Sequence, residues 1–257
     1  MHESRDILAS LRARIGAIEG TKPAVGGEVF SLGLAALDAR LGGGLPRGRL
    51  HELFAAQPED QPCLSAFALM LAIRIKPGPV LWIRQDGALR RSGGLHGPGL
   101  RELGFDPARL IEVIAPDEKA LLRAAGDAVR CPEVATVLIE PWKAARTIDL
   151  TASRRLAIAT EQSGVTALML RAEADPAPSA AHSRWEVRAM PAAPLAADAP
   201  GHVTLEVGLI RHRGGLAEFR QIVEWDRDQS GFREPALSGA VVSLPAGGSA
   251  ASQRLSA

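Results

Sequence analysis

Two carboxylates stand where strand-like segments end, and carboxylates at such positions are able to hold a metal ion beside phosphate. Glu140 closes the apolar run 136–139, and Asp86 follows shortly after Trp82 and Ile83. Because ligand sites in open parallel sheets lie at the carboxyl edge, a phosphate-processing enzyme would bind magnesium through water there. The alternative is an ordinary carboxylate at the end of a strand. The sequence favours this alternative, since nothing nearby grips phosphate.

The phosphate grip itself is missing from the sequence. A P-loop has the pattern Gly-x4-Gly-Lys followed by Ser or Thr, which brings a lysine to the terminal phosphates and a hydroxyl to magnesium. Lysines are rare among the 30 basic residues: Lys22 and Lys76 precede proline, and Lys119 and Lys143 precede alanine. The sequence therefore contains no P-loop of the standard form.

Other catalytic and metal-binding patterns are weak. The six histidines and two cysteines lack the His-x3-His and Cys-x2-Cys spacings of zinc sites. No Gly-x-Ser-x-Gly nucleophile elbow occurs. The glycine-rich stretches near residues 42 and 97 do not match the dinucleotide-binding pattern, because Arg47 and Glu102 stand where its third glycine is required. We therefore expect no catalytic residue, no metal and no cofactor.

Basic residues cluster at Arg90-Arg91, at Arg154-Arg155 and at Arg211-His212-Arg213. On a chain of net charge +1, a solvated face is the favoured interpretation of each cluster. Because the third cluster ends the first strand of a predicted hairpin, Arg211 and Arg213 are also candidate partner contacts.

Arg184 and Trp185 form a fourth candidate site. They pair a cation with a large ring inside a segment rich in Pro and Ala, and Arg and Trp are enriched in interface hot spots. One hypothesis is that both residues contact a partner. The favoured alternative is a Trp that folds back onto the sheet.

An amphipathic helix is predicted near the N-terminus, with Ser4 as its N-cap and Gly20 as its stop. Its apolar stripe includes Leu8, Leu11 and Ile15. The favoured interpretation is an arm packed on its own core. The alternative is a docking helix, in which these three side chains contact a partner or a neighbouring subunit.

Composition sets the class of protein. With 46% hydrophobic residues over 257 positions the chain can bury a full core, and its longest strongly apolar run, 67–75, is too short for a membrane span. The first residues are charged and lack the apolar stretch of a signal peptide. A net charge of +1 excludes nucleic-acid binding by bulk electrostatics. We expect a cytoplasmic protein with no membrane contact and only weak or indirect DNA contact.

Short apolar segments typical of strands and helices alternate along the middle of the chain, and these elements would position the candidate residues. Strands are predicted at 50–54, 80–83, 110–114, 136–140 and 165–170, and helices at 63–75, after Asp117 and at 151–163. This alternation predicts an α/β fold with a mostly parallel sheet flanked by helices on both faces.

The last third of the chain has a different character. Residues 172–202 predict a long surface loop with one short strand at 184–188, and 203–225 alternate as an antiparallel hairpin that turns at Gly214-Gly215. We predict three parts, namely an N-terminal arm (1–22), a core domain without a P-loop (23–233) and a flexible C-terminal tail (234–257).

The order of several motifs resembles the RecA-type recombinases over roughly residues 5–226. The motifs are Ser31-Leu32-Gly33, Ala36-Leu37-Asp38, Leu41-Gly42-Gly43-Gly44-Leu45-Pro46, Gly48-Arg49-Leu50-x-Glu52, Leu103-Gly104-Phe105-Asp106 and the strand 136–140. The resemblance implies a RecA-like core.

The departures from that family are informative. Where the family has its P-loop, residues 55–62 include two prolines and two acidic side chains. The resemblance places Asp86 at the position of the catalytic glutamate and Glu140 at that of the magnesium-strand aspartate, so that both are remnants of a degenerate site. Together these changes imply that ATP hydrolysis and filament formation on DNA are absent.

A narrower resemblance is to the ImuA group, RecA-like proteins of bacterial inducible mutagenesis cassettes. It rests on Pro79-Val80-Leu81-Trp82, Arg184-Trp185-x-Val187, Arg211-x-Arg213-Gly214-Gly215 and Val223-Glu224-Trp225-Asp226. It implies a non-catalytic accessory role in SOS-inducible translesion synthesis. The implied partners are an inactive Y-family polymerase homologue (ImuB) and an error-prone C-family polymerase, with RecA as a further candidate. Two alternatives stay open, a SulA-like division inhibitor and a RecA-like ATPase with an unconventional nucleotide site.

Overall fold

The computed structural model describes residues 28–75, 77–195, 199 and 201–235. The predicted N-terminal arm with Leu8, Leu11 and Ile15 lies outside the described residues, and so does the predicted tail from residue 236 onward. Among the helices of the described part, none is long and apolar enough to cross a membrane.

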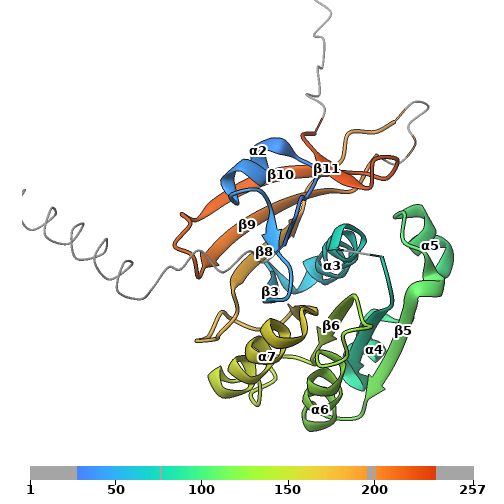
Figure 1. The fold of residues 1–257 in the computed structure, drawn as a ribbon. Coiled ribbons are helices and arrows are strands. Elements are labelled where there is room, and N and C mark those ends of the chain that lie inside the picture. Colours follow the sequence, from blue (N-terminus) through green and yellow to red (C-terminus); the bar gives the residue numbers. More distant parts are fainter. Residues whose placement is uncertain (1–27, 76, 196–198, 200, 236–257) are drawn as a thin grey trace, which may run out of the picture.

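A mixed sheet runs through the centre of the molecule (Figure 1). Within the described residues it has nine strands in the order β11-β10-β9-β8-β3-β7-β6-β4-β5. Their bounds are β3 Leu50–Ala55, β4 Val80–Gln85, β5 Leu110–Ala115, β6 Thr136–Glu140, β7 Thr166–Arg171, β8 Ser183–Ala189, β9 Thr204–His212, β10 Phe219–Asp226 and β11 Gly231–Arg233.

The strands from β8 to β5 pair in parallel, and β9, β10 and β11 extend the sheet in antiparallel fashion. The central parallel strands are buried on both faces, which explains their continuous apolar runs. The predicted α/β class, with a mostly parallel sheet and a C-terminal antiparallel hairpin, is confirmed.

Helices cover both faces of the sheet, as predicted (Figure 1). Helix α3 (Gln61–Ile75) packs into one hydrophobic core, and α6 (Glu118–Ala128) and α7 (Leu150–Ser163) pack into the other. Asp117 and Asp149 cap the N-termini of α6 and α7, each accepting a backbone N–H at 2.8 Å. Shorter helices are α2 (Ala35–Arg40), α4 (Asp86–Ser92) and α5 (Gly97–Glu102).

The glycine-rich motif before β3 forms a small antiparallel pair, β1 (Val29–Phe30) and β2 (Leu45–Pro46). Asp38 on α2 holds the preceding loop, because its carboxylate accepts from Leu32 N at 2.7 Å and from Ser31 Oγ at 2.6 Å. Gly44 has a φ of +133°, and a Cβ there would lie 2.2 Å from a backbone oxygen of Phe30. This motif is therefore required by the local packing.

Strand β8 differs from the prediction for residues 172–202. The strand exists, but it lies inside the sheet between β3 and β9 instead of in a surface loop. Ser183, Trp185 and Val187 are fully buried. Charged residues alternate with these three and hide their apolar pattern in the sequence, so that β8 resembles a surface segment until β3 is placed beside it.

Candidate functional site

Glu140 lies at the carboxyl end of β6 and is 3% exposed. Its Oε2 accepts from Trp82 Nε1 at 2.9 Å and from Arg84 Nε at 2.8 Å, and its Oε1 accepts from Gln61 Nε2 at 3.1 Å. The donors come from β4 and from the first residue of α3. The carboxylate therefore ties two strands and a helix together.

Arg84 provides the positive charge of this network and is 2% exposed. The parallel register of β4 and β6 places Arg84 directly beside Glu140. Its Nη1 donates to Glu112 Oε1 and to the Gly93 carbonyl, both at 3.0 Å, and its Nη2 donates to Ser92 Oγ. Each guanidinium nitrogen thus has a partner inside the protein, which is the condition for burying an ion pair.

The residues at this edge do not fit a magnesium ion. A water-bridged cation uses carboxylate oxygens as acceptors, whereas both oxygens of Glu140 already accept hydrogen bonds from Gln61, Trp82 or Arg84. A cation there would also face the guanidinium of Arg84, 2.8 Å from the carboxylate. The interpretation of Glu140 as a strand-end carboxylate agrees with this geometry.

The turn before α3 uses its backbone amides internally. Ala56 N donates to the Val187 carbonyl at 2.9 Å, and Gln57 N donates to Asp60 Oδ2 at 3.1 Å. Asp60 is 7% exposed and also accepts from Ala189 N at 2.8 Å. Pro58 has no N–H to offer. The amides that cradle phosphate in a P-loop are therefore directed to the protein's own oxygens.

Asp86 has an ion-pair partner of its own. It starts α4 and pairs with Arg90, one helical turn later, at 2.7 Å. The next residue, Gly87, is required for a close approach, since a Cβ there would lie 2.7–2.9 Å from the ring of Trp142. The two predicted remnants therefore pair with different arginines, Asp86 with Arg90 and Glu140 with Arg84.

A cleft of about 710 Å³ lies next to the Glu140 network, between the start of α3 and α5. Two arginines line it, but Arg84 is paired as described and Arg91 pairs with Glu173 at 2.7 Å. Glu59 adds a negative charge at its rim. Among the described residues that line it, the cleft thus has no unpaired arginine or lysine for polyphosphate.

Arg184 and Trp185 are placed in the interior. Trp185 is fully buried against Phe67, and Arg184, 6% exposed, donates through Nε to Glu52 Oε2 at 3.0 Å. Neither side chain is open to a partner, so the partner-contact hypothesis for these two residues is corrected. The favoured alternative, a Trp folded onto the sheet, agrees with the structure.

His51 belongs to a buried polar network that the sequence does not indicate. Its Nε2 lies 3.0 Å from the Pro46 carbonyl, which only accepts, so Nε2 is assigned the proton. Its Nδ1, 2.7 Å from Ser183 Oγ, accepts the hydroxyl proton, since that oxygen accepts in turn from Trp185 Nε1. The neutral imidazole is fully satisfied, and burial lowers the pKa of His51 to about 4.

Two more histidines stack beside it. The ring of His182 lies 4.7 Å from that of His212 and 6.1 Å from that of His51, both edge to face. Burial, followed by the nearby His51, lowers the pKa of His182 to about 3. In the described chain no group of three His, Cys, Asp or Glu side chains is arranged to hold a metal ion.

The basic clusters separate into two kinds. Arg90 and Arg91 pair with nearby acids. Two other clusters, far apart in the sequence, meet in space, because Arg154 on α7 lines the same groove as Arg211 and Arg213. Arg211 and Arg213 are exposed, and their role in partner contact stays a prediction.

Sequence reasoning finds Glu140 but misses its counter-ion, Arg84. The available signal is a single charged residue near the end of the apolar strand 80–85. Only the register of β4 against β6 shows which carboxylate it meets.

Comparison with known proteins gives the family. No protein-family model matches the chain. The chain is 36% identical over 204 residues to Protein ImuA of Caulobacter vibrioides, and this match covers 73% of the chain and 80% of that protein. Protein ImuA from a second strain of the same species matches to the same extent. The chain therefore belongs to the ImuA family.

Proposed function

We propose that the chain is a non-catalytic accessory subunit of an SOS-inducible translesion synthesis complex. It would act with an ImuB-like, inactive Y-family polymerase homologue and an error-prone C-family polymerase in damage-induced mutagenesis. Membership of the ImuA family supports the cellular role. The observation that supports the non-catalytic part is the buried ion pair of Glu140 with Arg84, together with the hydrogen bonds that Glu140 accepts from Trp82 and Gln61.

A nucleotide-driven motor needs a carboxylate that exchanges partners when nucleotide and magnesium bind and leave. Here the exchange would require breaking a buried ion pair, and leaving one buried charge unpaired costs about 3–5 kcal/mol. The amides of Ala56 and Gln57 are also occupied. These contacts favour a rigid scaffold at the strand edge over a nucleotide switch.

Partner contact would then use exposed surfaces of the chain. Arg211 and Arg213 at the end of β9 are exposed candidates within the described part. The predicted helix with Leu8, Leu11 and Ile15 is the second candidate. RecA is a further candidate partner, and DNA contact would be weak or indirect.

The test combines association and genetics. The purified full-length chain should form a stable complex with its ImuB-like partner, and deletion of its gene should abolish damage-induced mutagenesis. Re-expression of Glu140→Gln, matched to the wild-type level of soluble protein, should restore mutagenesis as well as the control Glu59→Gln does. Glu59 lies in the turn before α3, lines the cleft beside the Glu140 network and is exposed.

Failure of association together with unchanged mutagenesis after deletion would contradict the accessory role. Loss of mutagenesis with a soluble Glu140→Gln protein, while Glu59→Gln restores it, would contradict the non-catalytic part and favour the ATPase alternative.

A further inference from the structure

Arginines gather on the outer side of α6 and α7. Arg123 lies on α6, Arg154 and Arg155 lie on α7, and Arg211 and Arg213 lie next to α7 at the end of β9. All are exposed, and none makes a side-chain hydrogen bond or ion pair with any residue in the described part of the chain. The acids lining the same face are paired, Glu161 with Arg49 and Asp127 with Arg130. The face therefore has an uncompensated positive charge.

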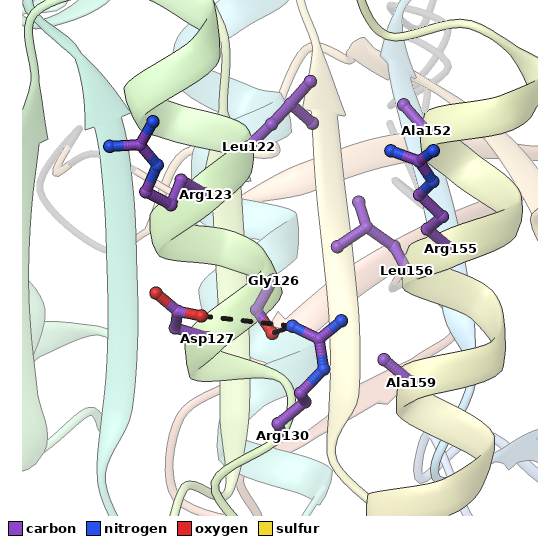
Figure 2. Close-up of a pocket in the computed structure, with 9 residues that line it drawn as sticks. All are labelled: Leu122, Arg123, Gly126, Asp127, Arg130, Ala152, Arg155, Leu156 and Ala159. Carbon is purple, nitrogen blue, oxygen red and sulfur yellow. Dashed lines mark hydrogen bonds and ion pairs between the residues drawn. The ribbon is translucent and has the colours of Figure 1, made fainter.

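Two grooves run along this face, and aliphatic side chains contribute to the lining of both. The first, of about 300 Å³, lies between α6 and α7. Figure 2 shows Leu122 and Leu156 pointing toward each other across it, with Arg130 reaching from the end of α6 and Arg155 at the rim. The groove is thus apolar at its floor and cationic at its edges.

The second groove, of about 450 Å³, lies on the other flank of α7. Leu150 and Ile158 line it and are 51% and 46% exposed. Arg154 lies between them at the same helical spacing of four residues, so that the three side chains share one stripe of α7. Exposed aliphatic groups next to cations are typical of a contact surface for another protein.

The chemistry of the grooves selects the kind of ligand. Single-stranded nucleic acid is bound by cations together with aromatic side chains on which bases stack. None of the side chains that line the two grooves in the described chain is aromatic. A phosphate backbone offers no apolar surface to the exposed Leu150 and Ile158, whereas aliphatic side chains of a protein segment would bury them.

We propose that the α6–α7 face binds an acidic protein segment that carries aliphatic side chains. Its aliphatic groups would enter the groove beside Leu122 and Leu156 and cover Ile158, and its carboxylates would pair with Arg154, Arg155 and the arginines at the end of β9. This inference does not depend on the proposed function, because it concerns the chemistry of one surface.

The test measures fluorescence anisotropy of labelled peptides with the full chain. The probe is an amphipathic peptide with Glu on one face and Leu on the other. The comparison probes replace Glu by Lys, replace Leu by Ser, or are oligo(dT). The Glu/Leu peptide should bind, and its affinity should fall as the salt concentration rises. Each of the other probes should bind with an affinity at least about tenfold lower, a difference of ~1.4 kcal/mol or more.

Two variants locate the binding. The double substitution Arg154→Gln and Arg155→Gln should lower the affinity for the Glu/Leu peptide about tenfold or more. Gly126→Leu should also weaken it without changing charge, because a side chain there fills the groove and its Cβ meets only the flexible end of Arg130, at 3.3 Å. The matched control is Arg101→Gln, since Arg101 is exposed on α5, away from this face.

Unfolding by urea would show that each variant is folded. The inference is overturned if the Lys/Leu peptide binds as well as the Glu/Leu peptide. It is also overturned if the folded variants bind as the wild type does, or if oligo(dT) binds more tightly and displaces the peptide, which would identify a nucleic-acid surface.

Discussion

The carboxyl edge of the sheet and the outer face of α6 and α7 differ in whether their charged side chains are buried and paired. At the edge, Glu140 and Arg84 are nearly fully buried and every polar atom of the pair is directed to another group of the protein. On the face, Arg154 and Arg155 point outward without an ion-pair partner in the described chain. The charges pair within the protein in the first region, and in the second they would be available to the acidic segment that we propose.

Under the proposed function, this difference would explain how an enzyme-like fold works as a scaffold. In parallel α/β sheets the carboxyl edge is the usual ligand site, because strand ends and helix N-termini converge there. Here the same convergence brings Gln61, Arg84 and Glu140 together, and they satisfy one another. In the proposed function, partner binding would then use surfaces outside this edge.

The largest effect is expected when the buried cation, Arg84, is removed. Arg84→Met should lower the free energy of unfolding by about 3–5 kcal/mol, because Glu140 keeps its burial and loses its counter-charge. Urea unfolding measures the change. The matched control, Arg155→Met, should stay within about 0.5 kcal/mol of the wild type.

A second substitution completes this test. Adding Glu140→Gln to Arg84→Met should recover a large part of the lost stability, since the unpaired charge is gone. Equal destabilisation by Arg84→Met and Arg155→Met would show that the edge pair is not an internal structural element.

The pair between β3 and β8 extends the comparison to a second buried site. Arg184→Met should cost about 3 kcal/mol, the lower end of the range for a broken buried pair, because Arg171 also lies near Glu52 and keeps some positive charge there. Thermal unfolding and urea unfolding both report the change. A neutral effect would favour the abandoned hypothesis that Arg184 faces a partner.

Acid should weaken the buried regions through His51. The unfolded chain binds a proton at this histidine near its ordinary pKa of 6.5, whereas the folded chain resists protonation until about pH 4. Stability is therefore fully present above pH 6.5 and is lost as the pH falls toward 4, by about 2 kcal/mol at pH 5. His182 acts in the same direction.

Urea midpoints between pH 7 and pH 5 check this dependence. His51→Gln should reduce it and leave the part that His182 contributes, whereas His96→Gln, at the exposed N-cap of α5, should leave it unchanged. The same slope in all three proteins would refute the assignment of His51 as a buried neutral group.

The smallest effect is expected for an exposed pair at the same edge. Asp86 and Arg90 form a surface pair at a spacing of four residues on α4, and Arg90 is 77% exposed. Arg90→Met should change the free energy of unfolding by about 0.5 kcal/mol or less. A loss comparable with that of Arg84→Met would mean that Asp86 has a larger structural role than its geometry indicates.

Much of this architecture could be predicted from the sequence. The apolar runs of β3, β4, β6 and β7 identify the parallel sheet, because strands buried on both faces have little alternation. Asp117 and Gly164 mark helix ends through local chemistry alone. The position of Glu140 at a strand end was predictable for the same reason.

What could not be predicted depends on pairing between distant segments. The partner of Glu140 follows from the register of β4 against β6, and the burial of Trp185 follows from the insertion of β8 beside β3. The meeting of Arg154 with Arg211 depends on the packing of α7 near the end of β9. No local pattern encodes these contacts.

Isothermal titration of the full chain with ATP and magnesium tests the central claim most directly, since that claim is the internal use of the strand edge. We expect no heat beyond that of dilution, because Glu140, Arg84 and the amides of Ala56 and Gln57 are all occupied. Binding with a micromolar Kd that is lost in Glu140→Gln would contradict the account and restore this edge as a nucleotide site.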